Sequence, residues 1–375
     1  MNINKNKITI VVFCSIIYIG LILNLILPSR KFSPLENRML QQMPSISWDA
    51  LVSGKLHDEM EKYVADQFFG RDFWISLKSN IEIGIGKKEN NGIYFGKDGF
   101  LLEKFEKPSE EIINNNIDSI IQFANNSAQD VFLMVVPNSV AIYNDKLPKY
   151  ASVYSQKNLL DNIKDRTQNS LKFVNVYDSL FENKEDYVFF QTDHHWTARG
   201  AYYGYKNFLE MEGTEPLSIN DFNIEVVSNS FFGTYYSKAR QDRKIGDSIE
   251  IFKPKKAPNV IVDYKDEGRQ TDSVYEFSRL EEKDKYTVFL DGNHALLTIT
   301  TDIGSDKELL VIKDSFAHSM IPFLTNHYKT IHVIDPRYYN LSINEYISEN
   351  NIDTVLVLYN LSNFASDTTI SKIKL

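Results

Sequence analysis

Four short runs of apolar residues constrain the fold of this chain more than any other feature. They occupy residues 131–136, 309–313, 330–334 and 354–358. The first and the last of these runs are nearly continuous and do not alternate with polar residues, which is typical of parallel strands buried on both faces of a sheet. Segments with helical spacing lie between the runs, and this alternation of strands and helices is the pattern of an α/β domain. The sequence therefore predicts a parallel sheet flanked by helices.

The part of the chain between residues 213 and 300 departs from this pattern. It contains short strand-like segments separated by turns, so we expect a small β-rich insertion that packs beside the sheet. With this insertion, residues 109–375 make one α/β domain. Residues 32–108 are expected to form a connector and a helical lead-in, because a polar, proline-containing stretch is followed by apolar residues at helical spacing.

Residues 1–31 contain the most apolar segment of the chain. No charged residue occurs at positions 8–27, and twenty residues at the helical rise match the hydrocarbon core of a bilayer. A cleaved secretory signal peptide is the alternative interpretation, but its apolar part is usually shorter and ends in a small-x-small cleavage site, which is missing here. We expect an uncleaved, single-pass membrane anchor, with the rest of the chain on the extracytoplasmic side of the cell membrane.

Charge and cysteine content exclude several classes of site. The chain has 41 basic and 50 acidic residues, a formal net charge of −9, whereas a nucleic-acid partner needs a basic face. We therefore expect no nucleic-acid partner. The one cysteine, Cys14, lies inside the apolar segment, so neither an intramolecular disulfide nor a cysteine zinc site is expected.

The sequence Asp193-His194-His195 offers an acid and a base at close spacing. In an extended loop, residues two apart point the same way, so the Asp193 carboxylate can accept a hydrogen bond from Nδ1 of His195 and leave Nε2 free as a base. His194 would point the opposite way and pack or support the site. The same three residues could also ligate a metal ion. Adjacent histidines rarely reach one ion together, so we expect no metal site and no cofactor.

Ser315 follows the predicted strand at residues 309–313 and precedes a predicted short helix at residues 316–324. A serine there lies at the carboxyl end of a strand, where α/β sheets bind ligands, and its N–H and the helix dipole can face an oxyanion. A capping serine without a catalytic role is the alternative. Together, Ser315 as nucleophile, His195 as base and Asp193 as orienting acid complete the set of groups of a serine hydrolase or acyltransferase.

The stretch Thr192-Asp193-His194-His195-Trp196-Thr197 resembles the signature of the DHHW protein family, which is related to the alginate O-acetyltransferase proteins. Both resemble a circularly permuted Ser-Gly-Asn-His (SGNH) hydrolase. The other matching motifs, which extend the resemblance over nearly the whole chain beyond the anchor, are Glu36-Asn37-Arg38 with Leu40, Phe232-Gly233-Thr234 with Tyr236-Ser237, Gly292-Asn293-His294, and Lys313-Asp314-Ser315-Phe316.

This resemblance implies a flavodoxin-like sheet in which the strands at residues 309–313, 330–334 and 354–358 correspond to the first three of the unpermuted fold. The strands at 131–136 and 173–177 would be its fourth and fifth. It also implies that Ser315, His195 and Asp193 are the catalytic residues. The asparagine that helps to bind the oxyanion would fall near Tyr359 and Asn360, where the usual Gly-x-Asn-Asp pattern is missing. Candidates for oxyanion or substrate contacts are Asn360, Tyr359, Arg337 and Asn293.

The function that the resemblance implies is O-acyl transfer, with acetyl as the acyl group, to a cell-surface or secreted polysaccharide. Acetyl-CoA is cytoplasmic, so a membrane-bound O-acyltransferase partner would supply the acyl groups. Two alternatives remain open at this point. One is an acetyl esterase of the same fold, and the other is a non-catalytic component of a polysaccharide synthesis complex.

Overall fold

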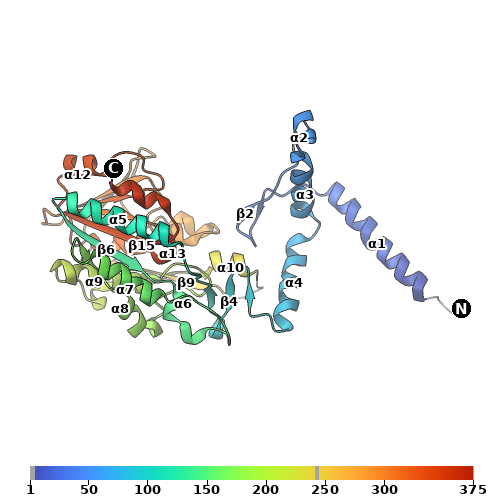
Figure 1. Cartoon of the computed structure of the whole chain (residues 1–375), viewed down its shortest axis with the longest axis horizontal. Helices are drawn as coiled ribbons and strands as arrows, with labels where there is room; N and C mark the ends of the chain where they lie inside the picture. Colours follow the sequence, from blue (N-terminus) through green and yellow to red (C-terminus); the bar gives the residue numbers. More distant parts are fainter. Residues whose placement is uncertain (1–4, 241–244, 375) are drawn as a thin grey trace. The chain divides into compact units, whose positions relative to one another are not determined.

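A computed structural model describes residues 5–240 and 245–374 of the chain (Figure 1). The chain divides into two compact units. The smaller comprises Met1–Asn90 and Ser237–Asp242, and the larger comprises Asn91–Tyr236 and Arg243–Leu375.

The smaller unit begins with an apolar helix, as expected. Helix α1 (Lys5–Ile26) contains a stretch that is long and apolar enough to cross a membrane, Lys7–Asn24. Length and composition fit a signal sequence as well as an anchor, so the uncleaved anchor stays a prediction. The unit continues with the hairpin β1 (Phe32–Ser33) and β2 (Arg38–Met39) and the helices α2 (Trp48–Val52), α3 (Lys55–Gln67) and α4 (Arg71–Gly84).

The Glu36-Asn37-Arg38 motif builds an ion-pair network inside this smaller unit. Arg38 donates two hydrogen bonds to Asp66 of α3, at 2.8 and 2.5 Å. Glu36 pairs with Arg71 of α4 at 2.5 Å. The motif therefore holds the hairpin against both helices, and its charges are compensated where they are shielded from water.

An eight-stranded sheet forms the centre of the larger unit. Its strand order is β11-β10-β12-β14-β13-β15-β6-β7. The strands are β6 (Asp130–Val136), β7 (Lys172–Phe173), β10 (Val260–Tyr264), β11 (Arg269–Thr271), β12 (Leu296–Thr301), β13 (Glu308–Lys313), β14 (Thr330–Ile334) and β15 (Thr354–Asn360). All four strands predicted from apolar runs are confirmed, and they pair in parallel as expected.

The insertion differs from the prediction, because most of its strands do not pack beside the sheet but join it. β12 pairs antiparallel with β14, β10 pairs antiparallel with β12, and β11 pairs antiparallel with β10. The sheet is therefore mixed rather than purely parallel. Only β8 (Phe222–Phe231) and β9 (Asp247–Pro254) form a separate antiparallel pair. The strand predicted at residues 173–177 is also shorter than expected. Asn175 accepts a hydrogen bond from the N–H of Tyr177, and this turn starts helix α8 (Tyr177–Glu182).

Helices cover both faces of the sheet. Figure 1 shows α5 (Glu110–Asn126) and α12 (Ile343–Glu349) on one side, and α8 and α9 (Ala198–Glu212) on the other. The remaining α-helices of the larger unit are α6 (Ser139–Ile142), α7 (Gln156–Thr167), α11 (Ile321–Leu324) and α13 (Leu361–Phe364), while α10 (Thr234–Ala239) continues into the segment assigned to the smaller unit. The short strands β4 (Ile93–Phe95) and β5 (Leu101–Glu103) pair antiparallel, and the short strand β3 (Glu89–Asn90) ends the first segment of the smaller unit.

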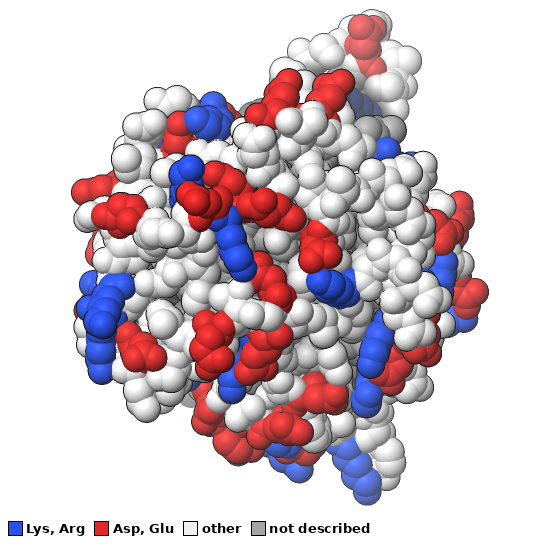
Figure 2. Space-filling model, turned by 90° about the vertical axis from the view of Figure 1, so that its left-hand side faces the viewer, with Lys and Arg blue, Asp and Glu red and all other residues white. Residues whose placement is uncertain are grey.

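The exterior contrasts with this buried centre. Figure 2 shows acidic and basic side chains intermixed on one face of the molecule. The central strands β13 and β15, by comparison, are buried along almost their whole length. Since β13 lies between β14 and β15, any residue just after it sits in the middle of the carboxyl edge of the parallel strands.

Candidate active site

The loop before α9 presents Asp193 and His195. An antiparallel bridge between Phe189 and Trp196 closes this loop, and Thr197 caps α9 by accepting from the N–H of Gly200 at 3.3 Å. Trp196 also donates from Nε1 to the backbone carbonyl of Phe316 at 2.8 Å. The tryptophan of the motif therefore connects the histidine loop directly to the turn that contains Ser315.

Asp247 at the start of β9 fixes the backbone of the same loop. Its carboxylate accepts from the N–H groups of Gln191 and Thr192, at 2.9 and 2.8 Å, and from the hydroxyls of Tyr187 and Thr192. The backbone N–H groups of this loop have no partner in a neighbouring strand of a sheet. One buried carboxylate therefore accepts hydrogen bonds from several of them at once.

Ser315 begins the turn after β13. Asp314 caps this turn, because its carboxylate accepts from the N–H of Phe316 at 2.9 Å and from the N–H of Asn360 at 2.8 Å. The element that follows is the 3-10 helix η7 (Ser315–Ser319), and α11 begins only at Ile321. The short helix predicted over residues 316–324, kinked or ended by Pro322, is therefore two elements, and Pro322 lies in the first turn of the second one. The N–H of Ser315 still has no partner within its helix, since it occupies the first position.

The structure brings Ser315, His195 and Asp193 together. Nε2 of His195 lies 2.8 Å from Oγ of Ser315, and its Nδ1 lies 2.6 Å from Oδ1 of Asp193. Asp193 and His195 are buried, whereas Ser315 is half-buried. The three groups form a continuous hydrogen-bonded chain with the geometry in which a histidine can remove a proton from a serine.

Backbone groups hold the Asp193 carboxylate in place. Oδ1 accepts from the N–H of His195 at 3.0 Å, and Oδ2 accepts from the N–H of Thr234 at 2.7 Å. Gly233 lies so close that a Cβ there would come within 2.2 Å of Oδ2. The Phe232-Gly233-Thr234 motif thus serves the orienting acid, because only glycine allows this backbone to approach the carboxylate.

Burial and neighbouring charges shift the pKa values of the site. Burial alone would raise the pKa of Asp193, but the charge of the neighbouring His194 and the hydrogen bond from His195 hold it well below its ordinary value. Burial opposes protonation of His194, yet the Asp193 charge outweighs it and raises the pKa of His194. For His195, burial and the charge of His194 lower the pKa to about 4. His195 is therefore neutral at pH 7, the form that acts as a base.

Tyr286 is a site residue that the sequence did not reveal. Its ring stacks on the ring of His195, with 3.7 Å between centroids and 12° between planes. Its hydroxyl donates to the backbone carbonyl of Ser315 at 3.1 Å and lies 3.1 Å from Oγ of Ser319. One side chain from the insertion therefore contacts both the base and the turn of the nucleophile. Nothing marks it among the 21 tyrosines, because its partners are distant in sequence.

Replacing Tyr286 with leucine is expected to lower kcat by about 10–100-fold with little change in KM, because the His195 ring loses its stacking surface and its alignment. Tyr286→Phe keeps the stack and loses only the hydroxyl contacts, so it should restore most of kcat. Steady-state kinetics of ester hydrolysis give kcat and KM for each variant. Tyr275→Leu, in the same insertion but without contact to His195, is the matched control. Equal loss in Tyr286→Phe and Tyr286→Leu would contradict a role for stacking.

Two of the four oxyanion or substrate candidates, Asn360 and Tyr359, lie at the end of β15. Asn360 caps α13, where its Oδ1 accepts from the N–H of Ser362 and from Nδ2 of Asn138, each at 3.0 Å, and its own Nδ2 donates to a backbone carbonyl. Tyr359 is almost completely buried in β15. Asn360 is therefore committed to other contacts, whereas the buried Tyr359 hydroxyl has no hydrogen-bond partner among the described residues.

The other two candidates contact one another. Arg337 donates from Nη2 to Oδ1 of Asn293 at 3.1 Å, and pairs with Asp335 at 2.6 Å. Lys313, buried two residues before Ser315, pairs with the same Asp335 at 3.1 Å. Besides burial and the charge of His194, the charge of Arg337 makes a smaller contribution to lowering the pKa of His195.

Two groups of side chains could hold a metal ion by composition. Asp193, His194 and His195 have ligand atoms within 4.8 Å of one another, but the Asp193 carboxylate already accepts the hydrogen bonds described above. The second group is Glu267, Asp291 and His294, and there the Asp291 carboxylate pairs with two arginines, Arg269 and Arg279. Ligands that are already neutralised in this way are poor candidates for a cation.

Solved structures similar to this chain share its fold. A DHHW family protein from Eubacterium siraeum DSM 15702 is 22% identical, with a TM-score of 0.66, and the match covers 76% of this chain and 95% of that one. PatB1 of Bacillus cereus, solved with a sulfonyl adduct, is 21% identical with a TM-score of 0.63 over 76% and 98% of the two chains. The O-acetyltransferase domain of Pseudomonas putida AlgJ is more distant, with 14% identity, a TM-score of 0.47 and coverage of 76% and 98%.

Sequence comparison gives the family directly. Among curated proteins, none matches this chain significantly. A model of the DHHW protein family matches residues 107–334, a span that includes the histidine loop, the insertion and the Ser315 turn. The chain therefore belongs to the DHHW protein family.

Proposed function

We propose that this protein is an extracytoplasmic O-acyltransferase that moves acyl groups, with acetyl as the natural group, to hydroxyls of a cell-surface or secreted polysaccharide. The observation that carries the proposal is the 2.8 Å contact between Oγ of Ser315 and Nε2 of His195, with Asp193 at 2.6 Å behind the ring. A serine in this setting is an activated nucleophile, and acyl groups are the usual substrates of such serines.

The reaction would proceed through an acyl-enzyme. Nε2 of His195 takes the Ser315 proton while Oγ bonds to the carbonyl carbon of the acyl donor. The N–H of Ser315 donates to the oxyanion of the tetrahedral intermediate, and the leaving group departs with the proton from His195. A sugar hydroxyl then gives its proton to His195 and attacks the Ser315 ester, which transfers the acyl group and restores the free serine.

The strand order supports a permuted SGNH arrangement. If β13, β14 and β15 correspond to the first three strands and β6 and β7 to the fourth and fifth, the observed order β14-β13-β15-β6-β7 reads 2-1-3-4-5. That is the flavodoxin-like order, in which ligands bind at the carboxyl ends beside the first strand. Ser315 follows β13 and lies at this position.

Similarity to PatB1 adds chemical support. The PatB1 structure contains a sulfonyl adduct, and sulfonyl compounds are electrophiles that modify activated hydroxyl groups. A chain with the same fold and a hydrogen-bonded serine–histidine pair is a candidate for the same covalent chemistry. Helix α1 suits an enzyme held at the membrane, where a membrane-bound O-acyltransferase could deliver acyl groups from the cytoplasm.

The test is acyl transfer by the purified full-length protein in detergent. With p-nitrophenyl acetate as donor and a mixture of oligosaccharides as acceptors, we expect a mass increase of one acetyl group on an acceptor and a rise in nitrophenol release when acceptor is present. Release without acceptor modification would indicate an acetyl esterase instead. No release under either condition would favour the non-catalytic alternative.

The pH dependence of ester hydrolysis follows from the lowered pKa of His195. The neutral ring is the base, so kcat/KM should rise with pH through a midpoint near about 4 and stay level at neutral pH. His194→Gln removes a positive charge that holds this pKa down, so the midpoint should move upward. A pH–rate series for both proteins measures the shift. A wild-type midpoint at or above the ordinary histidine value of about 6.5 would contradict this assignment.

A further inference from the structure

A cluster of exposed apolar side chains lies at the junction of α3 and α4 in the smaller unit. We call it the aromatic elbow, and it consists of Val64, Phe68, Phe69, Phe73, Trp74 and Leu77. Their exposed fractions range from 38% to 62%. Contiguous apolar groups of this kind are rare on soluble surfaces and mark a contact with a partner or a membrane.

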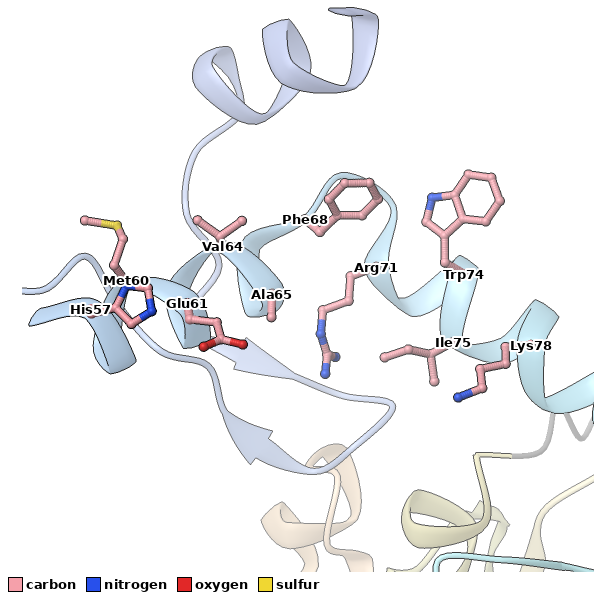
Figure 3. Close-up of a pocket in the computed structure, with 10 residues that line it drawn as sticks. All are labelled: His57, Met60, Glu61, Val64, Ala65, Phe68, Arg71, Trp74, Ile75 and Lys78. Atoms are coloured by element: carbon pink, nitrogen blue, oxygen red, sulfur yellow. The ribbon is translucent and has the colours of Figure 1, made fainter. Parts of the chain in front are cut away.

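The elbow borders a groove of about 700 Å³ between the two helices. Figure 3 shows Phe68 and Trp74 pointing to the same side of the bend, with Arg71 and Glu61 pointing to the opposite side. The helices therefore separate an apolar side from a charged side. This two-sided character is what a helix needs to lie at the boundary between lipid and water.

The elbow is bonded to the end of α1. Oδ1 of Asn24, at the last position of the stretch that can cross a membrane, accepts from the N–H of Phe69 at 2.6 Å. Just beyond α1, Arg30 pairs with Asp72 at 2.6 Å and its N–H donates to Gln67 at 2.8 Å. A bilayer that contains residues 7–24 must therefore have its surface at the elbow.

The apolar surface is also continuous between the two segments. A second hollow, of about 370 Å³, is lined by Leu27 and Pro28 after α1 together with Phe68, Phe69 and Phe73 from the elbow. Aromatic side chains are the ones that concentrate at the level of lipid headgroups. The position beside α1 and the aromatic composition thus identify the same occupant, which is lipid.

We propose that the aromatic elbow inserts into the interfacial layer of the membrane that α1 crosses, and so gives the smaller unit a second attachment to lipid besides the helix. This inference concerns the surface of the smaller unit and does not depend on the proposed acyl transfer. In bilayers, the elbow should lie about 5–10 Å into the boundary between headgroups and acyl chains.

The experiment uses the full chain with Cys14→Ser and one added cysteine, labelled with an environment-sensitive fluorophore and reconstituted in phosphatidylcholine–phosphatidylglycerol vesicles. Phe73→Cys and Val64→Cys probe the elbow. Lys62→Cys, exposed on α3 two residues before Val64, is the matched control. We expect spin-labelled lipids to quench the elbow labels and aqueous iodide to quench the control, and the depth calculated from two spin-label positions should match the interfacial layer.

A second measurement needs no added cysteine. Trp196 is fully buried, so with Trp48→Phe the quenching of tryptophan fluorescence by brominated lipids should come from Trp74 and disappear in Trp74→Phe. The proposal is overturned if iodide reaches the elbow labels as readily as the control. It is also overturned if the elbow labels are shielded from iodide and from spin-labelled lipid alike, since a protein partner would then cover this surface.

Discussion

Replacement of Ser315 by alanine is expected to reduce both acyl transfer and ester hydrolysis by about 10⁴-fold or more, as when the nucleophile of a serine–histidine pair is removed. The side chain lost is small and half-buried, and its hydroxyl bonds to Nε2 of His195. The fold should therefore survive, since Asp314 and Trp196 hold the turn and the loop through other contacts. Thermal unfolding of the variant, measured by circular dichroism, checks this point.

Ser319→Ala is the matched control for this experiment. Ser319 lies in the same 3-10 helix and is more deeply buried, but its hydroxyl contacts Tyr286 rather than His195. A sulfonyl fluoride should modify the wild type and Ser319→Ala at one site, which peptide mass spectrometry should place at Ser315, and should leave Ser315→Ala unmodified. Retained hydrolysis in Ser315→Ala, or a sulfonyl group on another residue, would reject Ser315 as the nucleophile.

The parallel part of the sheet was predictable because strands that are buried on both faces have nearly continuous apolar sequences. Residues 131–136 and 354–358 are apolar at nearly every position, and β6 and β15 pair along their full length. The sequences of the antiparallel strands are less distinctive. β12 is half-exposed at alternate positions and contains several threonines, so nothing in its sequence distinguishes a strand that joins the main sheet from one in a separate hairpin.

The site was predictable as a set of residue types but not as a complete environment. Asp193 and His195 are close in sequence, so their contact follows from local geometry, whereas their meeting with Ser315 depends on the topology that the family resemblance implied. Tyr286 and Asp247 could not be found in this way. Each acts through contacts to residues far away in the sequence, and a single tyrosine or aspartate in a strand-rich segment gives no sign of its partners.

The oxyanion donors are the part of the site where the sequence and the structure both depart from the family pattern. Asn360, the candidate nearest to the expected position, is used as a helix cap, while the first position of η7 leaves the N–H of Ser315 without a helical partner. Arg337 follows the neighbouring strand β14, Asn293 precedes β12, and the two side chains bond to each other. The second hydrogen-bond donor to the oxyanion, besides the N–H of Ser315, is therefore still to be identified by mutation.

Replacement of Asp193 by asparagine is expected to lower kcat by about 10³–10⁴-fold with a small change in KM, because an amide cannot hold the His195 tautomer that leaves Nε2 unprotonated. It also removes the negative charge that stabilises the protonated ring in the transition state, while the volume of the side chain stays the same. Burst kinetics with p-nitrophenyl acetate should show that acylation of Ser315, rather than substrate binding, is the step that slows.

Asp284→Asn is the matched control for the loss of Asp193, since both carboxylates contribute charge to this region but only Asp193 bonds to His195. Asp284→Asn should therefore change kcat by less than about threefold, whereas Asp193→Asn removes a group that acts as one unit with the base and the nucleophile. If the two variants lost activity equally, the loss of negative charge near the site would explain the effect, and the hydrogen bond that orients His195 would not. If Asp193→Asn unfolded the protein, the backbone hydrogen bond from Thr234 to Asp193 could be examined instead. Thr234→Ala keeps this backbone donor and should leave kcat nearly unchanged.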